Sequence, residues 1–203
     1  MELRDALTQI TEIRSRLASA EVYRGYRALP VAFSGVIAVA AGLVQRAYLE
    51  DPARNPGVYL ELWVGAAIVS LVVAGIEMGV RAWREDSRVS RESTGVALQQ
   101  FIPALAAGGL VTVVISRSAP GCVWMLPGLW QMFYSLGIFA SGRLLPRPTY
   151  WVAVFYLFAG CLVLGLGPER ALEPSCMAVP FAIGQFLAAV VLYSTLERDH
   201  VSA

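Results

Sequence analysis

Apolar residues are gathered into six long runs, separated by short polar segments that carry proline and arginine. Because a helix needs roughly 20 mostly apolar residues to cross the hydrocarbon core of a bilayer, each run predicts a transmembrane helix. The six predicted spans are Leu29–Gln45, Val58–Val80, Gly95–Ser116, Val123–Ser141, Tyr150–Gly167 and Cys176–Leu196. The expected fold class is therefore an all-α integral membrane protein with six transmembrane helices.

Composition supports a lipid environment. Hydrophobic residues make up 57% of the chain and charged residues 15%, whereas soluble domains are about 25% charged. A soluble monomer of this composition would expose apolar patches that such proteins avoid. The formal net charge of +1 argues against a nucleic-acid partner, which would require a strongly basic face.

The segment before the first span has helical spacing of apolar residues over residues 1–21. These residues are Leu3, Ala6, Leu7, Ile10, Ile13, Leu17 and Ala20. The polar face carries mixed charge, whereas a helix that binds anionic lipid should be basic. We expect it to bind a protein partner or to self-associate; an interfacial helix leading into the first span is the alternative. The domains are thus residues 1–27 (cytoplasmic amphipathic helix), 28–198 (transmembrane domain) and 199–203 (cytoplasmic tail).

The arginines divide unequally between the two sides of the predicted bundle. All 16 basic residues are arginine, and 12 fall in the N-terminal segment, the second and fourth connectors and the tail. By the positive-inside bias, that side is cytoplasmic. The sequence thus predicts a bacterial-type inner membrane protein with both termini in the cytoplasm.

The even-numbered spans resemble one another, which indicates an internal repeat. Pro120 and Pro174 precede Cys122 and Cys176 by the same offset, and Gln131 and Gln185 follow at matching positions. The odd-numbered spans show a fainter similarity. Three parallel helical hairpins would explain this pattern, and chance similarity between apolar helices is the alternative.

Gln131 and Gln185 are the main candidates for a ligand-binding site. An amide near the bilayer midplane must find a partner, because hydrocarbon offers none. One interpretation is a polar site between the fourth and sixth spans, with Trp130, Tyr134 and Ser135 beside it. The other, which we favour, is hydrogen bonding between helices, in which each bond contributes roughly 0.6 kcal/mol.

Two carboxylates lie within the second span. Glu61 is within one turn of one end, and Glu77 is close to the other end and four residues before Arg81, which is a favourable helical pairing. Intramembrane acids often mark ion pathways. Their depth instead favours interfacial carboxylates that reach water.

Cys122 and Cys176 both lie on the predicted extracytoplasmic side, where disulfides can form. We therefore expect a possible disulfide between them if their helices are adjacent. The single histidine, His200, lies near the C-terminus. No metal site and no cofactor are expected from this set of residues.

Small residues and aromatic residues predict how the helices pack and where they meet the interface. The motif Gly75-X-X-X-Gly79 and the pair Gly108-Gly109 favour close approach of helices. Aromatic residues near span ends read as interfacial anchors. They are Tyr59, Trp63, Trp83, Trp124, Tyr150, Trp151 and Tyr193.

Three classes of function remain open on this sequence. We favour a non-catalytic regulatory or accessory subunit that binds a protein partner at its cytoplasmic face. The alternative is a channel or transporter for a small, uncharged solute at the Gln131–Gln185 site. An enzyme ranks last, because no nucleophile–base pair, carboxylate dyad or metal-ligand cluster is apparent.

Overall fold

The structure is a computed structural model that describes residues 28–84 and 88–197. Within these ranges the chain is helical and contains no strand, which confirms the predicted all-α class. The long helices are α2 (Ala28–Tyr48), α3 (Pro56–Arg84), α4 (Arg88–Ser118), α5 (Leu126–Ala140), α6 (Thr149–Gly165) and α7 (Pro174–Leu192). Short 3-10 segments, η1 (Pro120–Met125) and η2 (Ser141–Arg143), flank α5, and a π-helical turn, η3 (Tyr193–Glu197), extends α7.

Five helical stretches are long and apolar enough to cross a membrane. They are Ala28–Tyr48, Pro56–Val80, Gln99–Ser118, Pro120–Arg143 and Pro174–Thr195. The sixth, α6, is apolar but only 17 residues long. The chain is thus consistent with a helical membrane protein, and the count of six spans stays a prediction.

Several helices run beyond the apolar runs that predicted them. The helix expected from Gly95 begins at Arg88, and the one expected to end at Val80 continues to Arg84. The reason is that backbone hydrogen bonding continues through polar residues once a helix is formed. Apolar content therefore located the helices but not their ends.

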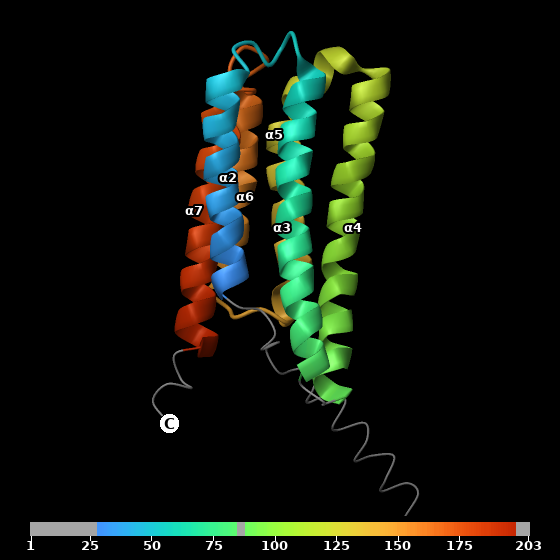
Figure 1. The fold of residues 1–203 in the computed structure, drawn as a ribbon, viewed down its shortest axis with the longest axis vertical. Coiled ribbons are helices and arrows are strands. Elements are labelled where there is room, and N and C mark those ends of the chain that lie inside the picture. Colours follow the sequence, from blue (N-terminus) through green and yellow to red (C-terminus); the bar gives the residue numbers. More distant parts are fainter. Residues whose placement is uncertain (1–27, 85–87, 198–203) are drawn as a thin grey trace, which may run out of the picture.

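The helices run along the long axis and alternate in direction, so that α2 begins at the end where α7 finishes (Figure 1). Each helix contacts the next one along the chain, and α7 packs extensively against α2. The order of contacts is thus a closed ring, with α5 against α4 and α6. The ring is weakest between α3 and α4, which touch only sparsely. The three-hairpin repeat stays a prediction.

Glycines allow the tightest contacts in this ring. A Cβ added at Gly42 would lie 2.5 Å from the Cβ of Ala178, and one added at Gly184 would lie 2.3 Å from the ring of Tyr156. Gly128 and Gly160 face each other across α5 and α6, since a Cβ on either would lie 2.7 Å from the carbonyl oxygen of the other. Close backbone approach is how membrane helices gain packing energy in the absence of a hydrophobic driving force.

Helices α3 and α4 are much less enclosed than the others. In the apolar stretches, 11% of residues are buried in α3 and 6% in α4, against 28% in α2, 39% in α7 and 44% in the stretch containing α5. The compact part of the described chain is therefore formed by α2, α5, α6 and α7. The α3–α4 pair lies against it with most of its apolar surface exposed.

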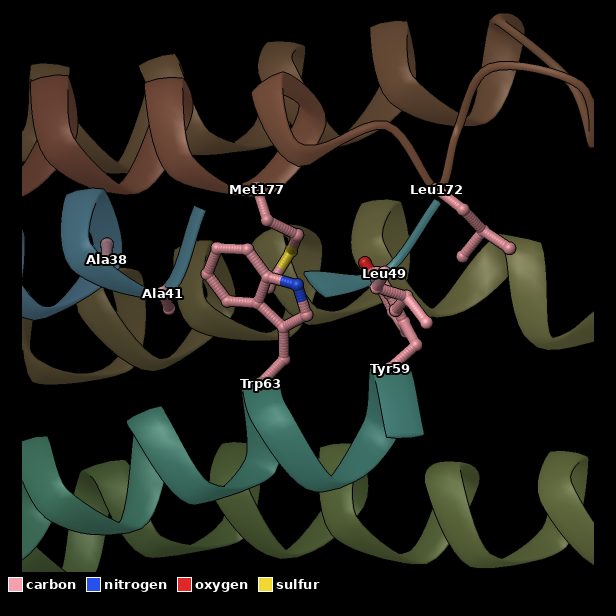
Figure 2. Packing of buried hydrophobic residues seen from close by; sticks show 7 residues of the cluster. All are labelled: Ala38, Ala41, Leu49, Tyr59, Trp63, Leu172 and Met177. Carbon is pink, nitrogen blue, oxygen red and sulfur yellow. The ribbon is translucent and has the colours of Figure 1, made fainter. Parts of the chain in front are cut away.

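One apolar cluster joins α3 to this compact part at the end where α3 begins. Figure 2 shows Tyr59 and Trp63 from α3 pointing toward Met177, Leu49 and Leu172. Tyr59 is 0% exposed and Trp63 is 4% exposed. Their expected role as interfacial anchors is thus wrong for these two residues, because neighbouring elements cover their rings. Tyr150, Trp151 and Tyr193 are exposed, as anchors must be.

The Gly128–Gly160 contact yields the first prediction. Gly160→Ala should lower the free energy of unfolding by about 2 kcal/mol, because its methyl group would meet a backbone carbonyl that cannot rotate away. Gly165→Ala is the matched control on the same helix, since a Cβ there meets nothing within 4 Å. Unfolding of both variants in lipid bicelles measures the difference. Equal stability of the two variants would show that α5 and α6 are not in such close contact.

Candidate functional site

Three glutamines are buried inside the bundle, on three different helices. Gln45 on α2, Gln131 on α5 and Gln185 on α7 are 1%, 0% and 5% exposed. In a hydrocarbon environment each amide must be paired within the protein. The side-chain nitrogen of each glutamine donates a hydrogen bond to a different element of the structure.

Gln131 pairs with a carbonyl group that a proline has left free. Its Nε2 donates to the backbone oxygen of Cys176 at 2.9 Å. In an α-helix this oxygen would accept from the N–H of residue 180. Residue 180 is Pro180, which has no N–H. The amide from α5 thus replaces the missing bond of α7 and ties the two helices together.

Gln185 meets an aromatic cluster that draws on four helices. Its Nε2 donates to the hydroxyl oxygen of Tyr134 at 2.7 Å. The ring of Tyr134 lies edge-on to Phe101 of α4, Tyr156 of α6 and Phe181 of α7, with centroid distances of 5.4, 4.9 and 5.7 Å. Such pairs stabilise by about 0.5–1.5 kcal/mol beyond burial alone. The amide fixes one ring at the centre of this cluster.

Two other predicted site residues are also bonded to neighbouring helices. Ser135 is fully buried, and its hydroxyl donates to the backbone oxygen of Ala153 on α6 at 2.7 Å. Trp130 donates its indole N–H to Thr112 on α4 at 2.8 Å, and Thr112 donates to Gly108 on the same helix. The five residues predicted as a ligand site thus all form bonds between helices.

Gln45 was not expected to matter, because it stands beside Arg46 at the end of its apolar run. Its Nε2 donates to the backbone oxygen of Leu172 at 2.7 Å, and its Oε1 accepts from the indole N–H of Trp63 at 2.8 Å. One amide therefore joins α2, α3 and the α6–α7 connector. The sequence did hold a sign of this bond. Gln45 ends the first predicted span and Trp63 lies near the start of the second, so both are expected at the same end of the bundle.

Two buried polar atoms in this region lack a hydrogen-bond partner among the described residues. They are Oε1 of Gln131 and the hydroxyl of Tyr59. A solute bound between α5 and α7 could use the Gln131 oxygen as an acceptor. To donate to that solute as well, the side-chain nitrogens of Gln131 and Gln185 would first have to break their hydrogen bonds to the Cys176 carbonyl and the Tyr134 hydroxyl.

The predicted carboxylates and cysteines differ in their surroundings, and Cys176 joins this network through its backbone oxygen. Glu61 is exposed and Glu77 is half-buried, both on α3. Cys122 and Cys176 are free thiols rather than the expected disulfide, and Cys176 donates to the backbone oxygen of Arg170 at 3.3 Å. Cys161, on α6, is also a free thiol and is exposed.

The remaining predictions concern metals and the two ends of the chain. Within residues 28–84 and 88–197, no group of three His, Cys, Asp or Glu side chains could hold a metal ion. The amphipathic helix expected at residues 1–21 and the tail at 199–203 lie outside the described residues.

No family model matches the chain, and no curated protein or solved structure matches it. Its function must be inferred from its own residues.

The bond from Gln131 predicts a coupling with Pro180. Gln131→Leu should lower the free energy of unfolding by about 1 kcal/mol. In a Pro180→Ala background the same change should cost far less, because the N–H of residue 180 then serves the Cys176 carbonyl. Gln185→Leu is the control, since its partner Tyr134 does not depend on residue 180. Unfolding of all variants in bicelles gives the coupling, and costs that add without coupling would contradict the assignment.

The two bonds of Gln45 predict a larger loss. Gln45→Leu leaves the indole N–H of Trp63 and the oxygen of Leu172 buried and unpaired, so unfolding should become easier by roughly 2 kcal/mol or more. Val44→Leu, on the exposed side of the same turn, should have almost no effect. Chemical unfolding followed by circular dichroism measures both. A loss no greater than that of Val44→Leu would argue that Gln45 faces water.

Proposed function

We propose that the protein is a non-catalytic accessory subunit of the membrane, which acts by helix association within the bilayer. The outer face of α3 is the docking surface, and a second copy of the chain is its first partner. The supporting observation is a glycine motif on α3 that no other part of the described chain covers.

The motif has the spacing of a close helix–helix contact. Gly75 and Gly79 are four residues apart, each is followed by a β-branched residue, and Leu71-Val72 precedes them by one further turn. All six of these side-chain positions are exposed on one face of α3. A Cβ built at either glycine would meet nothing within 4 Å. Small residues at this spacing drive pairing of two identical helices.

The glycines of the described helices differ in how closely they are packed. The mid-helix glycines of α2, α5, α6 and α7 are in contact with neighbouring helices. Among the glycines that the structure describes, those open in mid-helix are Gly65, Gly75, Gly79 and Gly109, all on α3 or α4. Glycine within a helix costs about 1 kcal/mol relative to alanine. An intermolecular contact along α3, which carries three of these four glycines, would offset this cost there.

The predicted cytoplasmic segments fit the same proposal. Residues 1–21 and the arginines of the second connector would add a surface for a partner already held by α3. Catalysis is not part of the proposal, since the amide nitrogens of Gln45, Gln131 and Gln185 already donate to neighbouring elements.

Transport of a small uncharged solute between α5 and α7 is the alternative. The unpaired Oε1 of Gln131 is the observation in its favour. Against it, the amide nitrogens of Gln131 and Gln185 already have partners. Flux that is lost in a Gln131→Leu/Gln185→Leu protein that still folds would favour transport.

Self-association through α3 is tested with the full-length protein in lipid vesicles. Replacing Gly75 and Gly79 together by Ile should weaken the dimer about tenfold, which is roughly 1.4 kcal/mol, because the two α3 backbones could no longer approach. Gly109→Ile, on the exposed surface of α4, is the matched control and should leave the dimer unchanged. Energy transfer between donor- and acceptor-labelled copies, measured against the protein-to-lipid ratio, reads the affinity.

Each result bears on the proposal. A monomer at every protein-to-lipid ratio would reject self-association through α3. A dimer equally sensitive to Gly75, Gly79 and Gly109 would place the contact elsewhere on the hairpin. A dimer sensitive only to the α3 pair would support the proposed surface.

A further inference from the structure

A pocket lies where η2 and the connector lead from α5 into α6. Its volume is about 350 Å³, and it is open on one side. Figure 1 shows this connector at the end of the bundle where α2 begins and α7 finishes. The arginine bias predicts that this end faces the cytoplasm.

The pocket combines apolar walls with a cationic rim. Its apolar and aromatic lining residues are Ile138, Phe139, Leu145, Tyr150 and Trp151. The two aromatic side chains are 58% and 71% exposed, as expected for residues at the level of lipid headgroups. A ligand for this pocket therefore has an apolar part as well as a polar one.

Arg147 is the charged group of the lining. It is exposed and has no ion pair with any described residue. Arg143, four residues earlier at the end of η2, is also exposed but does not line the pocket. No acidic side chain contributes to the lining. The pocket therefore favours an anion.

Thr149 supplies a second polar group. It lines the pocket and is only 5% exposed, and its hydroxyl has no hydrogen-bond partner in the part of the chain that the structure describes. A buried hydroxyl without a partner is costly. A ligand that accepts a hydrogen bond from it would therefore bind more tightly. The backbone N–H groups of residues 149–151 already donate to the carbonyls of residues 146–148. The backbone of this turn therefore offers no free donor at residues 149–151, and the Arg147 guanidinium and the Thr149 hydroxyl are the lining donors on which the proposal rests.

We propose that this pocket binds the phosphate group of an anionic membrane lipid, with Arg147 and Thr149 as its donors. Phosphate oxygens accept strong hydrogen bonds from guanidinium groups. The glycerol and first acyl carbons lie against Phe139, Leu145 and Trp151. Inorganic phosphate shares the recognised chemistry but would leave the apolar walls unused.

The test uses delipidated full-length protein in neutral detergent. Short-chain phosphatidylglycerol, short-chain phosphatidylcholine and inorganic phosphate are titrated separately, and binding is read by native mass spectrometry and by the rise in Tm. We expect phosphatidylglycerol to bind at least tenfold more tightly than phosphatidylcholine. Arg147→Gln should weaken it at least fivefold, whereas Arg143→Gln, with the same loss of charge at the same end, should not.

Thr149→Val separates a binding role from a structural one. It removes the unpaired hydroxyl, so the ligand-free variant should be at least as stable as the native protein, while its affinity for phosphatidylglycerol should fall severalfold. Loss of stability together with unchanged affinity would overturn the role of Thr149.

The three probes distinguish the sources of the phosphate. Tight binding of phosphatidylglycerol with weak binding of inorganic phosphate supports a lipid ligand. Equal affinity for both, lost in Arg147→Gln, supports a free phosphate in the same site. Binding of none of them, or equal effects of Arg147→Gln and Arg143→Gln, would overturn the proposal.

Discussion

A carbonyl that has lost its helical partner inside an apolar bundle needs another donor, because neither lipid nor apolar side chains can supply one. Pro180 creates this situation at Cys176, in the first turn of α7, and the amide of Gln131 supplies the donor from α5. The proline and the glutamine therefore depend on each other. The bond also joins two helices whose main packing partners are others: α5 contacts α4 and α6, and α7 contacts α2 and α6.

The described residues form two parts, one closely packed and one less enclosed. Gln45, Gln131 and Gln185, with the glycines between α2 and α7 and between α5 and α6, lock the compact part of the bundle. Among residues 56–80 of α3, whose side chains the structure describes, the buried ones are Tyr59 and Trp63 in the first turns. Beyond them, α3 presents an apolar face with open glycines. The described chain thus has a closely packed side and a less enclosed side, and the less enclosed side is the one proposed above for self-association.

The sequence was sufficient to predict the helices, since a run of apolar residues has few other solutions. It also identified Gln131 and Gln185 as groups that need partners. It did not identify those partners, because the freed carbonyl of Cys176 is a backbone group and any proline in a span could have provided one. Tyr59 and Trp63 were mistaken for interfacial anchors, since depth along a helix does not tell which face it buries. Gln45 was missed because it adjoins the polar connector.

The most direct test of this account is the distance between the Gln131 amide nitrogen and the Cys176 carbonyl in a lipid bilayer. Solid-state NMR of protein labelled with ¹⁵N in the glutamine side chains and ¹³C in the cysteine carbonyls measures it, with Gln131→Leu to assign the signal. The account predicts the rapid dephasing that an N···O separation of 2.9 Å requires, and its loss in the variant. Dephasing that is absent, or that persists without Gln131, would contradict it.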